Sequence, residues 1–238
     1  MRRRCHINDV GGTLCKRLGE VPGLYEAVEQ NMWNYLASTD LFGCEVEHRA
    51  REIAETIQKL KAFNRGAGPK PTAALGKYGR DIANIGVWAI DQGLFNVNEE
   101  LLYTDAVMYL KRARELEVEI VILSDSSKKF VDVYLSQQVN GKPASDLISR
   151  MFLNPQEYDK RKPATFSKIC HELALEGGLV ELVFDDDKTI CDVAVRAKHE
   201  FGLQYDIYLM DRPNACVGIS KANDCGIKVV NSYAGVLT

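Results

Sequence analysis

From Thr104 to Val230 short apolar segments alternate with helical ones, and this alternation constrains the fold more than any other feature of the sequence. The pattern predicts strands at Cys5–Asn8, Glu119–Leu123, Met151–Leu153, Val180–Phe184, Asp206–Met210 and Ile227–Val230. It predicts helices between them, beginning at Thr104, Lys128, Pro163 and Thr189. Strands that alternate with helices through short loops form a parallel sheet covered on both faces. The sequence therefore predicts an α/β protein with a Rossmann-like core.

Between the first strand and Thr104 the pattern is helical. Apolar residues recur three or four apart, first from Leu24 to Leu36 and then from Val46 to Leu60. A further helix is expected at about Asp81–Ile90. This helical material divides the chain into a core of residues 1–18 and 100–238 and an inserted α-helical segment of residues 19–99.

The segment from Lys59 to Arg80 holds six basic residues, no acidic residue, two prolines and four glycines. One interpretation is a mobile loop that attracts an anionic substrate. The other, slightly favoured, is a solvated loop whose charges have no specific role.

The composition is that of an ordinary globular protein, with 46% hydrophobic and 26% charged residues. A net charge of −3 argues against a general nucleic-acid partner. No apolar run is long enough to span a membrane, and the seven cysteines include no Cys-x-x-Cys pair. The histidines show no spacing typical of a zinc site. We therefore expect a cytoplasmic protein with neither a nucleic-acid nor a membrane partner.

The first predicted strand breaks into a Gly-Gly turn immediately after a carboxylate, Asp9. Ligands of open α/β sheets collect at the carboxyl ends of the strands. Gly11 and Gly12 allow a close approach of the backbone to a bound anion. Asp9 is thus a candidate catalytic residue, although an Asp before two glycines is also a common turn former.

Three later segments of the chain carry further candidate site residues. Ser124-Asp125 ends the second strand, Lys162 precedes Pro163, and the acidic run Asp185–Asp187 ends another strand, with Asp192 on the following helix. Together with Asp9-x-Gly11-x-Thr13-Leu14, these motifs occur in the order typical of the haloacid dehalogenase superfamily, which the chain resembles over most of its length.

The resemblance implies roles for these residues. Asp9 would be the nucleophile, Thr13 would orient its turn, and Ser124 with the backbone N–H of Asp125 would hold a phosphoryl oxygen, with Gly11 and Gly12 lining the same substrate site. Lys162 would offset negative charge, with Lys160, which lacks the proline, as the alternative.

A Mg²⁺ cofactor would be held by Asp9, the Gly11 carbonyl and the acidic run. Alternation along a strand favours Asp187 over Asp186 as the ligand, supported by Asp192, although Asp185 shares the side of Asp187. The helical segment would be the cap that closes over the site and selects the substrate.

One departure from the family pattern concerns Gly11, because phosphatase members carry there a second Asp that transfers protons. General acid–base catalysis contributes about 10²–10⁴-fold to a rate. The leading hypothesis is a Mg²⁺-dependent phosphatase that acts on a small phosphorylated metabolite through an aspartyl-phosphate on Asp9.

Other functions remain open. A 2-haloacid dehalogenase also lacks the second Asp, but it uses no metal and has no acidic run. A regulatory protein that binds phosphoesters without turning them over, and a phosphonate hydrolase, are the remaining alternatives.

Overall fold

The computed structural model of the chain describes residues 2–17, 20–39, 41, 43–64, 72–96, 100–126, 128–153, 156–212 and 226–237. The chain divides into two compact units. The first comprises Met1–Cys15 and Leu102–Thr238, and the second comprises Lys16–Leu101. The expected division at residues 18 and 100 lies close to these limits, and the assignment of the units as domains stays a prediction.

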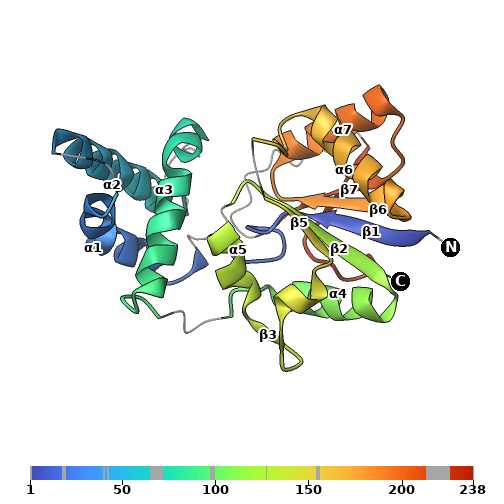
Figure 1. Cartoon of the computed structure of the whole chain (residues 1–238), viewed down its shortest axis with the longest axis horizontal. Helices are drawn as coiled ribbons and strands as arrows, with labels where there is room; N and C mark the ends of the chain where they lie inside the picture. Colours follow the sequence, from blue (N-terminus) through green and yellow to red (C-terminus); the bar gives the residue numbers. More distant parts are fainter. Residues whose placement is uncertain are drawn as a thin grey trace. The chain divides into compact units, whose positions relative to one another are not determined.

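The first unit contains a parallel sheet with β1 (Arg3–Asn8) at its centre (Figure 1). The strand order is β5-β2-β1-β6-β7-β8, and every pairing within it is parallel. The other strands are β2 (Val118–Leu123), β5 (Arg150–Phe152), β6 (Gly178–Asp185), β7 (Asp206–Met210) and β8 (Ile227–Val230). The predicted α/β class with a Rossmann-like parallel sheet is therefore confirmed.

Helices cover both faces of this sheet, and side chains along β1 alternate between them. Cys5 and Ile7 join an apolar cluster with residues of α6 (Pro163–Leu175) and α7 (Lys188–Phe201). His6 lies on the opposite face, where its Nδ1 is 2.9 Å from the hydroxyl of Tyr109 on α4 (Thr104–Glu115). Figure 1 shows α6 and α7 on one side of the sheet and α4 on the other.

The carboxyl ends of β1, β2 and β6 lie together at one edge of the sheet. Asn8, the last residue of β1, pairs with Ile122 on one side and with Phe184 on the other. The chain continues from β1 to β2 on one side and later returns to β6 on the other side. Open α/β sheets bind their ligands at such a change of direction.

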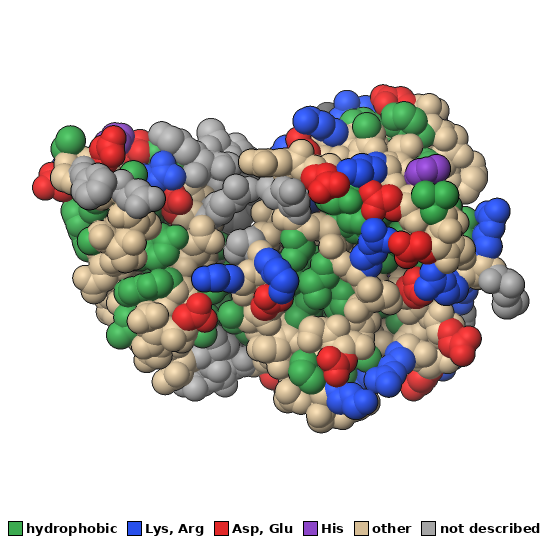
Figure 2. Space-filling model, in the orientation of Figure 1, with side chains coloured by type: hydrophobic (Ala, Val, Ile, Leu, Met, Phe, Trp, Pro, Cys, Tyr) green, Lys and Arg blue, Asp and Glu red, His purple; other side chains and the backbone are tan. Residues whose placement is uncertain are grey.

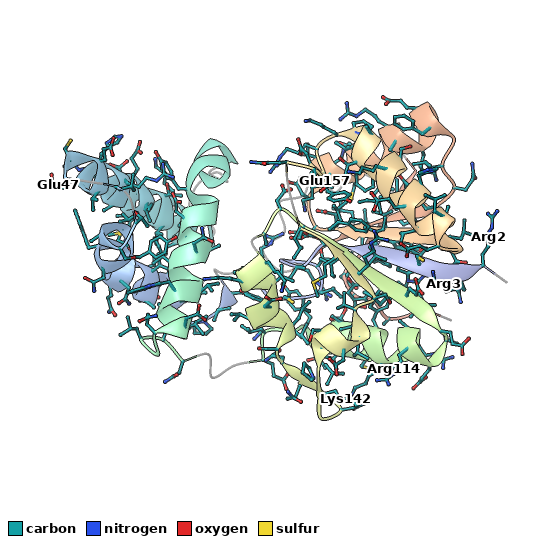
Figure 3. The ribbon with its side chains drawn as sticks, viewed as in Figure 1. Arg2, Arg3, Glu47, Arg114, Lys142 and Glu157 are labelled. Carbon is teal, nitrogen blue, oxygen red and sulfur yellow. The ribbon has the colours of Figure 1, made fainter. Side chains whose placement is uncertain are left out.

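A hairpin that sequence patterns did not predict lies between α5 (Lys128–Leu135) and β5. Strands β3 (Gln138–Val139) and β4 (Lys142–Pro143) pair antiparallel around Asn140-Gly141. Both turn residues have positive φ, 54° and 75°, as a two-residue type I′ turn requires. Lys142, labelled in Figure 3, marks this hairpin. The expected helix from Lys128 ends at Leu135, and Gln138 already belongs to β3.

Gly178 is required by packing at the start of β6. A Cβ atom built there would lie 2.9 Å from the Cys5 Sγ and 3.0 Å from the Leu173 carbonyl oxygen. Any other residue would therefore force apart β1, β6 and the end of α6.

The second unit consists mainly of α1 (Leu24–Ala37), α2 (Cys44–Asn64) and α3 (Thr72–Asp91). Its core uses the apolar residues whose helical spacing the sequence displays, among them Val28, Met32, Ile53 and Ile57. The expected loop from Lys59 to Arg80 is largely wrong, because α2 extends to Asn64 and α3 begins at Thr72. Residues 65–71 lie outside the described part of the chain.

No helix in the described part of the chain is long and apolar enough to span a membrane. Acidic and basic side chains are interspersed on the visible face of the first unit (Figure 2). Of the cysteines that the structure describes, Cys5, Cys15 and Cys191 are buried, as expected of small apolar side chains, whereas Cys44 is exposed.

Candidate active site

Asp9 is held at the end of β1 in a tightly hydrogen-bonded loop. Its backbone N–H donates to the carbonyl of Phe184 on β6 at 3.0 Å. The carbonyl of Val10 accepts from the N–H groups of Leu14 and Cys15, at 3.1 and 2.8 Å. Asp9 as a residue is only 6% exposed. A buried carboxylate of this kind needs a nearby positive charge.

The two glycines of the loop have different roles. Gly12 has a φ of 86°, a backbone conformation that residues other than Gly rarely adopt. Gly11 does not have a positive φ, and a Cβ built on it meets no atom within 4 Å. The backbone therefore does not require a glycine at position 11, where a Cβ atom would meet no neighbour.

Lys160 supplies the positive charge beside Asp9. Its ammonium donates to Asp9 Oδ1 and to Asp185 Oδ2, both at 3.0 Å, and the residue is 8% exposed. Burial alone would lower the pKa of Lys160, but the carboxylates of Asp185 and Asp9 outweigh it and hold this pKa well above its usual value. Lys160 is therefore a fixed cation between two strand ends.

Lys162 does not reach the site, which corrects the prediction that it is the lysine beside Asp9. Its side chain is 71% exposed, and its Nζ lies 3.6 Å from Asp159 Oδ2. The reason is a turn in which the N–H of Lys162 donates to the carbonyl of Asp159 at 3.0 Å. Lys162 is then the N-cap of α6, whereas Lys160 projects from the turn toward Asp9.

The loop that carries Lys160 is anchored on both sides. Arg161 Nη1 lies 2.7 Å from Asp125 Oδ2 at the end of β2, and the Thr165 hydroxyl donates to the Asp159 carbonyl at 2.7 Å. Glu157, labelled in Figure 3, marks the start of this loop and pairs with Lys168 of α6. These contacts give Lys160 a defined position.

Three carboxylates converge at the site. Oxygen atoms of Asp9, Asp185 and Asp186 lie within 4.8 Å of one another. Burial raises the pKa of Asp185, the charges of Asp9 and Asp186 raise it further, and Lys160 opposes them. Carboxylate oxygens are hard ligands of the kind that Mg²⁺ prefers, so this cluster is a candidate cation site.

Asp187 and Asp192, the metal ligands that the sequence favoured, have other partners. Asp187 is the N-cap of α7, where its Oδ1 accepts from the N–H of Thr189 at 2.8 Å. Asp192 pairs with Lys188 one turn along the same helix, at 2.7 Å. The alternation argument was wrong because β6 ends at Asp185, which accepts from the N–H of Asp187 at 2.8 Å and turns the chain.

Ser124 and Thr13 are both buried near the end of the sheet, 3% and 0% exposed. The Ser124 hydroxyl accepts from the N–H of Ser126 at 3.3 Å. The Thr13 Oγ1 has no hydrogen-bond partner among the described residues. Asp125, expected to offer its backbone N–H, uses its carboxylate to hold Arg161.

No protein-family model and no curated protein sequence matches the chain. Solved structures do resemble it. The UTR4 protein of Saccharomyces cerevisiae is 15% identical, with a TM-score of 0.55, over 97% of this chain and 98% of that one. A predicted phosphoglycolate phosphatase from Haemophilus somnus is 14% identical, with a TM-score of 0.54, over 100% and 97%.

A dehalogenase is also 14% identical, with a TM-score of 0.51, over 98% of this chain and 95% of that one. At such low identity these similarities define the fold alone. The chain has the haloacid dehalogenase-like fold, which the motif order predicted.

Proposed function

We propose that the chain is a Mg²⁺-dependent phosphohydrolase that forms an aspartyl-phosphate on Asp9. The observation that carries the proposal is the meeting of Asp9, Lys160, Asp185 and Asp186 at the carboxyl edge of the sheet. A similar structure described as a predicted phosphoglycolate phosphatase supports the reaction class.

In the first step a carboxylate oxygen of Asp9 attacks phosphorus, and the bond from phosphorus to the ester oxygen breaks. Lys160 offsets the negative charge of the carboxylate and of the phosphoryl group. In the second step water attacks the phosphorus of the aspartyl-phosphate and releases inorganic phosphate and the free Asp9 carboxylate. Ser124 and Thr13 are the hydroxyl groups that we assign to the phosphoryl oxygens.

Asp9, Asp185 and Asp186 are the residues that we assign to the metal. A bound Mg²⁺ would supply positive charge that reduces the repulsion between a carboxylate and a phosphate. The leaving group takes its proton from solvent or from the substrate, since Gly11 has no side chain to provide one. We further propose that the unit of residues 16–101 acts as the cap that selects a small phosphorylated substrate.

A 2-haloacid dehalogenase is the second candidate. It is favoured by Lys160, which provides a cation for Asp9 without any metal, and by the similarity to a solved dehalogenase. The extra carboxylate of Asp186 argues against it, because carbon–halogen cleavage by Asp9 has no use for a cation site.

The test is phosphate release from a panel of small phosphoesters, with and without Mg²⁺, by the wild type and by Asp9→Asn. We expect Mg²⁺-dependent release that the substitution abolishes. Asp206→Asn is the matched control, because Asp206 lies at the opposite, amino end of a strand and pairs with Lys228 at the surface. Release by Asp9→Asn at the wild-type rate would refute the assignment of Asp9 as the nucleophile. Halide release from haloacids by the wild type without a metal would establish the second candidate.

A further inference from the structure

Three side chains from distant parts of the first unit meet behind the loop that carries Asp9. Arg212 follows β7, Asp105 lies in the first turn of α4, and Tyr233 follows β8. Arg212 and Tyr233 are 6% and 3% exposed. We call Asp105, Arg212 and Tyr233 the loop clamp.

Arg212 fixes the far end of the loop. Its Nη2 donates to the carbonyl of Thr13 at 3.1 Å, and its Nη1 donates to Asp105 Oδ1 at 2.9 Å and to the carbonyl of Asn231 at 3.2 Å. The guanidinium also lies 4.2 Å from the ring of Tyr103. A buried guanidinium is costly unless it is paired in this way.

Tyr233 fixes the near end of the loop. Its hydroxyl donates to Asn8 Oδ1 at 2.9 Å, and its N–H donates to Asp105 Oδ2 at 2.8 Å. Its ring stacks on Tyr109 with a centroid distance of 4.1 Å. Asp105 thus receives one bond from each of the other two members and joins them.

The two anchored residues, Asn8 and Thr13, lie on either side of Asp9 and of the two glycines. Glycines give a loop conformational freedom, and a nucleophile that is displaced by about 1 Å can lose about 10²-fold in rate. We propose that the loop clamp is a set of positioning residues that holds the Asp9 carboxylate in its reactive position. This inference rests on the proposed function, since it concerns the same nucleophile.

The test compares two substitutions that each remove one buried phenol. Tyr233→Phe removes the bond to Asn8. Tyr205→Phe removes an equivalent bond of 3.0 Å to the carbonyl of Ala194, at the amino end of β7 and away from the site. Both variants keep their rings and should fold, with similar small losses of thermal stability.

In steady-state kinetics with the best phosphoester of the panel, we expect Tyr233→Phe to lower kcat by about 10- to 100-fold with little change in KM. Tyr205→Phe should leave kcat near the wild-type value. Arg212→Lys keeps the positive charge but replaces the two donating guanidinium nitrogens, Nη1 and Nη2, by a single ammonium. This substitution should also lower kcat. Wild-type kcat in Tyr233→Phe, or an equal loss in Tyr205→Phe, would overturn the inference.

A second readout needs no activity. Hydrogen exchange of a peptide that covers residues 9–15 should be faster by about two- to tenfold in Tyr233→Phe, the change expected from one lost hydrogen bond, and unchanged in Tyr205→Phe. If the wild type hydrolyses no phosphoester, the proposed function fails while exchange still decides whether the clamp holds the loop. Unchanged exchange in Tyr233→Phe would overturn the clamp in either case.

Discussion

Substitution of Lys160 by Met tests the charge balance of the site most directly. The change removes an ammonium that lies 3.0 Å from two carboxylate oxygens and leaves three carboxylates with oxygen atoms within 4.8 Å of one another. Two unit charges at that separation repel by about 3.5 kcal/mol at an effective dielectric constant of about 20. Removing one partner of a buried ion pair costs about 3–5 kcal/mol. We therefore expect Lys160→Met to lower the free energy of unfolding by about 3–5 kcal/mol at neutral pH.

The loss should depend on pH and on Mg²⁺. Without the ammonium, which opposes the effect of burial, the pKa of Asp185 in the folded state is raised further above the unfolded value. The folded state then binds more protons than the unfolded state at mildly acidic pH, so the stability deficit shrinks as the pH falls. Added Mg²⁺ should also restore part of the stability, because it supplies the missing charge.

The assay is urea unfolding of the wild type, Lys160→Met and Lys162→Met at two pH values, with and without Mg²⁺, together with phosphate release. Lys162 is the matched control, because it lies two residues away with a side chain that is 71% exposed. Its substitution should change stability by no more than about 0.5 kcal/mol and should preserve activity. Equal losses in the two variants, or a deficit at Lys160 that grows as the pH falls, would refute the reasoning.

Four further predictions concern single positions. Gly11→Asp should fold normally, because its Cβ meets no atom within 4 Å, and should raise phosphate release by up to about 10²-fold; no increase would show that proton transfer does not limit the rate. In calorimetric titrations, Asp186→Asn should weaken Mg²⁺ binding, whereas Asp187→Asn should keep the affinity and cost about 1 kcal/mol of stability as a lost helix cap. Gly178→Ala should lower the free energy of unfolding by about 1–3 kcal/mol, measured in urea, since its Cβ would lie 2.9 Å from a sulfur atom. Burial lowers the pKa of His6 to about 4, so stability should fall as the pH drops from about 6.5 to about 4, and a constant stability over that range would contradict the burial argument.

Patterns of apolar residues predicted the strands of the sheet and the helices around it, because both depend on local periodicity. The hairpin at Asn140-Gly141 was not predicted, since strands of two residues have no periodicity to detect. The position of Asp9 was predicted because a carboxylate at a strand end followed by glycines is a local signal.

The remaining parts of the site depend on geometry that spacing does not encode. Lys160 and Lys162 differ in which way a turn directs them, and the predicted helix start at Pro163 makes Lys162 the N-cap of α6. Asp187 was favoured over Asp186 because alternation was extended to Asp187, whereas the strand ends at Asp185. Arg212 and Tyr233 carry no sequence signal, since their partners lie far away along the chain.

The position of β1 at the centre of the sheet has a consequence for folding. Its pairing partners are distant in sequence, because Arg4 pairs with Val118 on one side and with Leu179 on the other. During synthesis β1 emerges well before either partner, so its backbone groups stay unpaired on both edges until most of the chain is available. Contacts between such distant segments slow folding and expose strand edges to association. The strand that positions Asp9 is thus synthesised well before its partners and is completed only when β6 is available, and a truncated chain that lacks β6 would carry an open, aggregation-prone edge beside Asp9.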